Sequence, residues 1–170
     1  MRNPSLHTTV RAVAVAGVVA ATLAGCGAIQ DAVSDEPRRD ATSGEIEAAD
    51  EVTAFALRVG DCLDSTALDE EIETVPVIPC DEPHDAEVYA RYEFDEGAYP
   101  GEDSVAQTAE KFCYNEFSGF VGATYEDSAL DFFPMFPVQD GWEQIDDREV
   151  LCMVIDLDGG VTATMAGAAR

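Results

Sequence analysis

The chain has 170 residues, of which 35 are Asp or Glu and 9 are Lys or Arg, so its formal net charge at pH 7 is −26. This charge repels the phosphates of nucleic acid, which is therefore excluded as a partner, and it disfavours direct adhesion to an anionic lipid surface. The acidic residues indicate a strongly hydrated surface, with binding of a cation or a basic partner as the sharper alternative.

Residues 1–25 have the composition of an export signal. Arg2 and Arg11 supply positive charge, and the apolar run over 12–23 is too short to span a bilayer comfortably. The segment ends in Leu23-Ala24-Gly25-Cys26, which resembles the lipobox of bacterial lipoproteins, where the cysteine is lipidated, with palmitate among its acyl chains. Several acyl chains give stable anchoring. We therefore expect a lipid anchor at Cys26 and a location at the extracytoplasmic face of the cell membrane. A secretory signal followed by a chance cysteine is the alternative.

Residues 26–52 contain acidic and small residues and no aromatic side chain. Such a segment cannot bury enough apolar surface to offset the entropy lost on ordering. The composition therefore predicts a flexible acidic tether, followed by a folded domain over 53–170. Loss of the two signal arginines would leave 7 basic against 35 acidic side chains in the mature chain.

Four cysteines remain once Cys26 is assigned to lipid. An even number in an oxidising compartment predicts two disulfides, for which three pairings are open. We favour the sequential pairing, Cys62–Cys80 and Cys113–Cys152. No Cys-x-x-Cys pair is present, which argues against a redox centre or a zinc site of the usual spacing.

The first half of the domain has the alternation of strands. Phe55, Leu57 and Val59 alternate with other residues, which predicts a half-buried strand from residue 53 to 59. Prolines interrupt a short apolar strand over 75–78, which favours an edge position. Alternation is clearest from residue 86 to 94, where Val88, Ala90, Tyr92 and Phe94 are predicted to share one face.

One helix is expected after residue 101. Ser104 and Gln107 have the spacing of a capping box, which places the start of the helix at Ser104. Gly119 and Gly122 mark its end. Five residues fall on one face at helical spacing: Val105, Ala109, Phe112, Cys113 and Phe117.

The last part of the chain is expected to complete a sheet. Prolines make 130–138 an irregular or edge strand, and Asp140-Gly141 a turn before Trp142. Residues 148–155 are nearly all apolar, as in a central strand covered on both faces. A hairpin at Asp158-Gly159-Gly160 would lead to a last strand over 161–165. The elements together predict an α+β domain, an antiparallel sheet with one main helix packed on it and two disulfides.

Cys80 and His84 are the first candidates for chemistry. They could act as a nucleophile and its base, or as metal ligands, but a disulfide would consume the thiol of Cys80. We therefore expect His84 to hydrogen-bond the backbone and carboxylates of its own turn. An envelope hydrolase or transferase that uses His84 with Asp85 or Asp61 is kept as the alternative.

The remaining patterns are weaker. With 35 acidic residues, a pair drawn from Asp61, Asp85 and Glu87 carries no signal without geometry. Asp156-Leu-Asp158-Gly-Gly and Asp140-Gly resemble fragments of calcium loops but lack the EF-hand spacing, so weak surface binding of calcium stays open. Aromatic residues could line a binding groove, although core packing is commoner for them; these are Phe132, Phe133, Phe136 and Trp142. No catalytic residue, metal or cofactor is predicted.

Seven landmarks occur in an order that resembles the septum-formation domain of actinobacterial exported and membrane proteins, over about residues 53–170. The most specific landmark is Pro79-Cys80-Asp-Glu-Pro-His84-Asp-Ala-Glu-Val88. The others are Val59-Gly-Asp-Cys62, Tyr99-Pro-Gly101, Cys113, Phe120-Val-Gly122, Trp142 and Asp147-Arg148-Glu-Val-Leu-Cys152.

The resemblance implies an extracytoplasmic domain of a high-GC Gram-positive bacterium, loosely associated with septation and the envelope, and it brings no catalytic mechanism. The chain departs from the family at Asp146-Asp147-Arg148, where Gly-Asp-Arg is expected in a tight turn. We expect a non-enzymatic lipoprotein that binds an envelope or division protein. Its candidate structural or binding residues are His84, Asp61, Asp85, Trp142 and Arg148.

Overall fold

The structure is a computed structural model that describes residues 36–68 and 72–170. The expected signal segment and Cys26 lie outside these residues. Within the described ranges, no helix combines the length and the apolar character needed to cross a membrane.

The described residues form one antiparallel sheet of six strands in the order β1-β3-β2-β4-β6-β5. The sheet curls, and one long helix packs on it, which confirms the expected α+β architecture. The strands are β1 (Asp50–Thr53), β2 (Cys62–Leu63), β3 (Thr74–Ile78), β4 (Ala86–Glu93), β5 (Asp131–Met135) and β6 (Glu149–Ile155). The α-helices are α1 (Glu102–Val121) and α2 (Gln139–Gln144), and single 3-10 turns are η1 (Ala54–Ala56), η2 (Ser65–Ala67) and η3 (Tyr125–Asp127).

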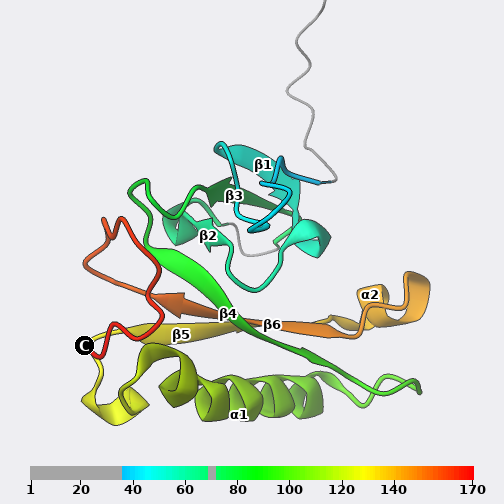
Figure 1. Cartoon of the computed structure of the whole chain (residues 1–170). Coiled ribbons are helices and arrows are strands. Elements are labelled where there is room, and N and C mark those ends of the chain that lie inside the picture. Colours follow the sequence, from blue (N-terminus) through cyan, green and yellow to red (C-terminus); the bar gives the residue numbers. More distant parts are fainter. Residues whose placement is uncertain (1–35, 69–71) are drawn as a thin grey trace, which may run out of the picture. The chain divides into compact units, whose positions relative to one another are not determined.

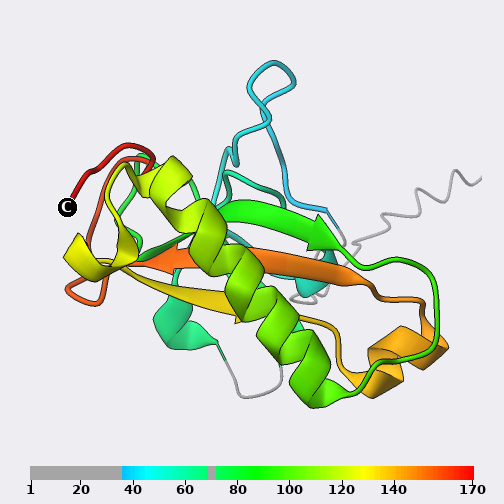
Figure 2. The same cartoon turned by 90° about the horizontal axis from the view of Figure 1, so that it is seen from below.

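Helix α1 covers one face of β4, β6 and β5, as Figures 1 and 2 show from two directions. Its buried residues follow the helical spacing that the sequence predicts, and Cys113 and Phe117 are fully buried among residues of β6. The expected start at Ser104 is wrong. The helix begins at Glu102, after Gly101, whose φ of 96° is a conformation that favours glycine. It ends at Gly122 in the left-handed conformation, as a glycine after a helix usually does.

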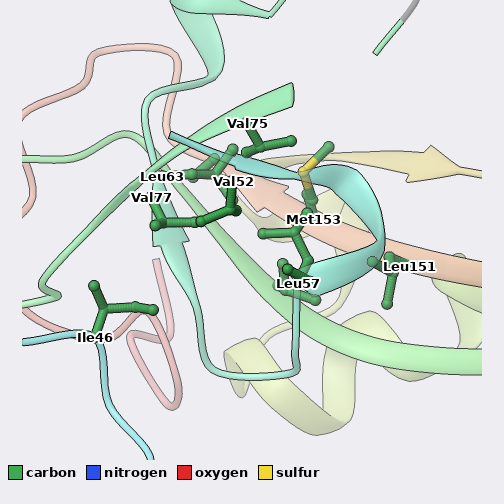
Figure 3. Packing of buried hydrophobic residues seen from close by; sticks show 11 residues of the cluster. Ile46, Val52, Leu57, Leu63, Val75, Val77, Leu151 and Met153 are labelled. Atoms are coloured by element: carbon green, nitrogen blue, oxygen red, sulfur yellow. The ribbon is translucent and has the colours of Figure 1, made fainter. Parts of the chain in front are cut away.

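The other face of β6 lies under β1, β3 and β2, which curl over it (Figure 1). Figure 3 shows this second core, in which Val52, Val75 and Val77 pack with Met153 of β6. Residues of β6 alternate between the two cores, because its side chains point to opposite faces in turn. Strand β6 is therefore the central strand expected, covered on both faces.

A β-bulge interrupts β4 at Tyr89, between the pairs Val88↔Met153 and Ala90↔Cys152. The extra residue moves the apolar side chains to the opposite face. Val88 packs in the core under β1 and β3, whereas Ala90 and Tyr92 pack toward α1. The prediction that Val88 shares a face with Ala90, Tyr92 and Phe94 is therefore wrong.

The fold begins earlier than residue 53. In the expected tether, Arg39 and Ile46 form a β-bridge, Ile46 is buried, and β1 pairs with β3. Arg39 also binds the carboxylate of Asp61 with two hydrogen bonds, of 2.5 and 2.7 Å. Residues 38–52 are thus held by partners distant in the sequence and by two buried apolar side chains, Ile46 and Val52. The expected strand over 53–59 is wrong, because η1 replaces it and leaves Phe55 exposed.

Strand β3 is an interior strand and not the expected edge. The carbonyl of Pro76 accepts a hydrogen bond of 3.3 Å from the N–H of Asp64. The donor that Pro76 lacks therefore falls opposite Asp64, one residue beyond the end of the two-residue β2. The bond that Pro76 cannot make is the reciprocal one, to the carbonyl of Asp64, and β2 ends at Leu63, before that position.

The C-terminal part confirms β5 as an edge strand but differs elsewhere. Residues 139–144 form α2 instead of a turn, and Trp142 is buried in it. The expected strand over 161–165 is reduced to one bridge between Val161 and His84. Both expected disulfides are confirmed: Cys62–Cys80 joins β2 to the segment after β3, and Cys113–Cys152 joins α1 to β6.

Candidate functional site

An apolar groove of about 560 Å³ lies beside β5 and β6, on the face that α1 does not cover. This volume is within the range of about 300–1,000 Å³ that is usual for ligand pockets. Its apolar lining comes from four separate segments of the chain: Phe55, Ile72, Phe133, Met135, Phe136, Val138 and Leu151. A second recess of about 340 Å³ shares three lining residues with the groove, Phe55, Asp147 and Glu149, and extends it toward Ile145.

The exposed apolar side chains gather at these two hollows. Among the described residues, seven large apolar side chains are exposed, and four of them line the groove or the recess. They are Phe55 (64% exposed), Val138 (62%), Ile145 (61%) and Phe133 (43%). Single exposed apolar residues are ordinary on a protein surface, but a cluster in a hollow marks a site that a ligand or partner covers.

Four carboxylates also line the groove: Glu73, Asp140, Asp147 and Glu149. Glu149 is paired with Arg91. Among residues 36–68 and 72–170, no basic side chain pairs with the other three at salt-bridge distance. The groove thus combines apolar walls with three carboxylates that form no ion pair within the described residues.

Two of these carboxylates, Asp147 and Glu149, are half-buried, and burial raises the pKa of both. Asp147 Oδ1 accepts a hydrogen bond of 3.1 Å from the backbone N–H of Glu149, and no described donor contacts its Oδ2. The positive charge of Arg148 lowers the pKa of Asp147, but burial is the larger effect, so this carboxylate is poorly solvated. A cation placed beside Asp147 would offset that cost.

Trp142 and Arg148 support the turn that carries Asp147. The guanidinium of Arg148 lies 3.9 Å from the centre of the Trp142 ring, and its Nη1 donates to the carbonyls of Trp142 and Asp147. Trp142 Nε1 donates in turn to the carbonyl of Gly97, at 2.8 Å. The two residues that the sequence singled out here are therefore in contact, and they position the acidic turn. Trp142 does not line the groove, and Arg148 lines the recess that extends it.

The turn is retained at Asp146, the position where the chain departs from the family pattern. Asp146 has a φ of 59°, the left-handed conformation that glycine adopts freely and that Asp tolerates better than most residues. It also forms an exposed ion pair of 2.7 Å with Arg148. Asp146 therefore adopts the left-handed conformation that a glycine would adopt at this position.

The groups proposed for hydrolysis are engaged with separate partners. His84 is buried, and its Nδ1 lies 2.8 Å from the carbonyl of Glu82. Asp85 accepts two hydrogen bonds of 2.6 Å from the backbone N–H and the hydroxyl of Ser65, which begins η2. Asp61 binds Arg39 and the backbone N–H of Arg58. The hydrogen bonds of His84, Asp85 and Asp61 do not join them into one catalytic group.

The potential metal ligands are also bonded to other groups of the protein. In the described part of the chain, one group of three comes close enough to share an ion, Cys62, Cys80 and Glu87, but the two sulfurs form a disulfide. Glu87 accepts hydrogen bonds from the Thr164 hydroxyl and the Met165 N–H. In the segment that resembles a calcium loop, the Asp156 carboxylate contacts Arg170 and the N–H of Asp158.

The sequence identified part of the groove. Phe133 and Phe136 line it as suggested, whereas Phe132 packs against α1 and Trp142 is buried. Phe55, Val138 and Asp147 were missed as groove residues. Phe55 was assigned to a strand, and its exposure became visible only with η1 in place of that strand. One feature of the sequence pointed to Asp147, namely its position next to Arg148 in a motif of the family.

Comparison with known proteins places the chain in a family. No match to a curated protein or to a solved structure was found. Residues 59–170 match the family described as septum formation, which suggests a role in cell division or in the cell envelope. The matched region contains both disulfides and the lining of the groove apart from Ala54 and Phe55. Because the match covers more than half of the sequence, this chain belongs to the septum formation family.

Proposed function

We propose that this protein is a non-enzymatic lipoprotein of the cell envelope that binds another protein through the groove beside β5 and β6. The observation that carries this proposal is the cluster of exposed apolar side chains in the groove, Phe55, Phe133 and Val138. Such a cluster is unfavourable in water unless a partner covers it.

The family supports the cellular setting, because it relates the chain to septum formation and is not known as enzymatic. The lipobox-like sequence around Cys26 supports an anchor that holds the domain at the extracytoplasmic face of the membrane. In this arrangement the anchor supplies location and the groove supplies specificity. The partner is then an envelope or division protein that meets the domain at the membrane surface.

Site-specific photocrosslinking in cells tests the groove. A photoreactive residue at Phe133 should capture a discrete set of envelope proteins, whereas one at Tyr114 should not. Both side chains are 43% exposed, but Tyr114 lies on α1, which packs on the opposite face of the sheet. Equal capture at the two positions would refute the groove as the binding surface.

The anchor and the absence of enzymatic activity are tested separately. Mass spectrometry of the mature N-terminus should find acyl chains on Cys26, and Cys26→Ala should release the protein from the membrane fraction. Purified protein should not turn over cell-wall substrates. Turnover that His84→Ala alone abolishes, in a variant that still folds, would instead support an envelope hydrolase or transferase.

A further inference from the structure

We propose that the groove binds an extended segment of the partner protein that carries Lys or Arg next to apolar side chains, with the cation beside Asp147. This inference rests on the proposed function and specifies the chemistry of the ligand. It follows from the charge, the walls and the edge strand of the groove, taken in turn.

Charge complementarity favours a basic occupant. The groove carries three carboxylates without a basic partner among the described residues, Glu73, Asp140 and Asp147, on a chain of net charge −26. A second copy of this chain would bring the same negative charge to the groove and is repelled. An anionic lipid headgroup is disfavoured on the same ground.

The apolar walls favour an organic cation over a metal ion. Calcium takes six to eight oxygen ligands. Within the described residues, no three of the groove's carboxylates come close enough to share an ion. Lys and Arg instead place apolar methylene groups along apolar surface and keep the charge at the tip. Phe55, Phe133 and Val138 offer such a surface, and Asp147 Oδ2 is an acceptor without a protein donor among the described residues.

The edge strand favours recognition through side chains. Strand β5 is the edge of the sheet beside the groove, and an extended segment can in general add to such an edge through backbone hydrogen bonds. Pro134, in the middle of β5, has no N–H to donate and interrupts a continuous ladder. Backbone pairing along β5 is therefore limited, and the selectivity falls on Asp147 and the aromatic walls of the groove.

The test uses the full mature chain in detergent and three fluorescent ten-residue peptides. One alternates Leu and Lys, and in the other two Gln or Glu replaces every Lys. Anisotropy titration should show that the Lys peptide binds on the order of tenfold more tightly than the Gln peptide, a difference of about 1.4 kcal/mol, and that the Glu peptide binds least. Added salt should reduce this preference.

Asp147→Asn should remove most of the preference for Lys and leave the Gln peptide unchanged. The amide keeps an oxygen to accept from the Glu149 N–H, so the turn can be retained. Glu110→Gln is the matched control, because it makes the same charge change at an exposed position of α1 and should leave both affinities unchanged. If Asp147→Asn does not fold, Asp140→Asn and Glu73→Gln remove negative charge from exposed positions of the same groove and should also reduce the preference for Lys.

Three results would overturn the inference. Equal binding of the Lys and Gln peptides would show that the groove selects apolar residues alone. Equal weakening by Glu110→Gln and Asp147→Asn would assign the preference to net charge. Dimerisation of the protein that the Lys peptide reverses would indicate that a second copy occupies the groove. If crosslinking from Phe133 captures a partner in cells but no peptide preference appears, the basic segment is refuted while the proposed function stands.

Discussion

The buried ion pair between Arg39 and Asp61 decides where the folded domain begins. The two side chains are 9% and 3% exposed and share two hydrogen bonds. Removal of one member of a buried pair leaves the other charge without compensation and destabilises a protein by about 3–5 kcal/mol. We therefore expect Asp61→Ala to lower the free energy of unfolding by this amount, a large part of the roughly 5–15 kcal/mol typical of a domain.

Urea unfolding followed by the fluorescence of Trp142 measures this loss, because the chain has a single tryptophan and that residue is buried. The exposed pair Arg58–Glu36, whose side chains are 56% and 61% exposed, is the control. Glu36→Ala should cost less than about 1 kcal/mol, as exposed pairs do. Replacing both buried partners, with Arg39→Met and Asp61→Leu, should cost less than Asp61→Ala, because no charge is left buried alone.

The refuting result is a loss for Asp61→Ala as small as that for Glu36→Ala. The pair would then be solvated in solution, and residues 36–52 would be the tether that their composition predicts. The fold would in that case start near β2, the strand that contains Cys62 of the first disulfide. Arg39 would then have no structural role.

Three further predictions concern the rest of the domain. Loss of the Cys113–Cys152 bridge should lower the free energy of unfolding by about 4 kcal/mol, and loss of Cys62–Cys80 by about 3 kcal/mol, because the closed loops span 39 and 18 residues. The urea midpoints of the two double Cys→Ala variants show whether the longer loop contributes more. Burial raises the pKa of Tyr89 above its usual 10, so the folded state keeps a proton that the unfolded state loses, and stability should fall as pH rises above about 10. Tyr89→Phe should reduce this alkaline slope and, by removing the hydrogen bond to the Cys113 carbonyl, cost about 1 kcal/mol near neutral pH. Asp146→Val should cost about 1–3 kcal/mol because of its positive φ, whereas Asp146→Gly should stay close to the parent in thermal unfolding.

Residues whose partners are close in sequence were the most predictable. The buried face of α1 followed from helical spacing, and the central position of β6 from its continuous apolar run. The bulge at Tyr89 was not visible, because a strand with one extra residue still alternates on each side of it. Arg39 and Val52 take fixed places in the fold because they contact Asp61 and β3, respectively. These partners are more than twenty residues away, so no local pattern around residues 39–52 could reveal the contacts.

The groove follows from a mismatch of strand lengths, which explains why the sequence showed only part of it. Strands β1 and β3 have four and five residues, whereas β4 and β6 below them have eight and seven. The covering layer therefore ends before β6 does. On the covered face of β6, Met153 is fully buried, Leu151 lies at the border of the groove, and Glu149 is half-buried within it. The Cys62–Cys80 bridge lies at the other end of this layer, because Cys62 pairs with Glu87, next to the pair Ala86↔Ile155. The bridge therefore holds the far end of the cover, and the apolar and acidic end of β6, around Glu149, stays open to a partner.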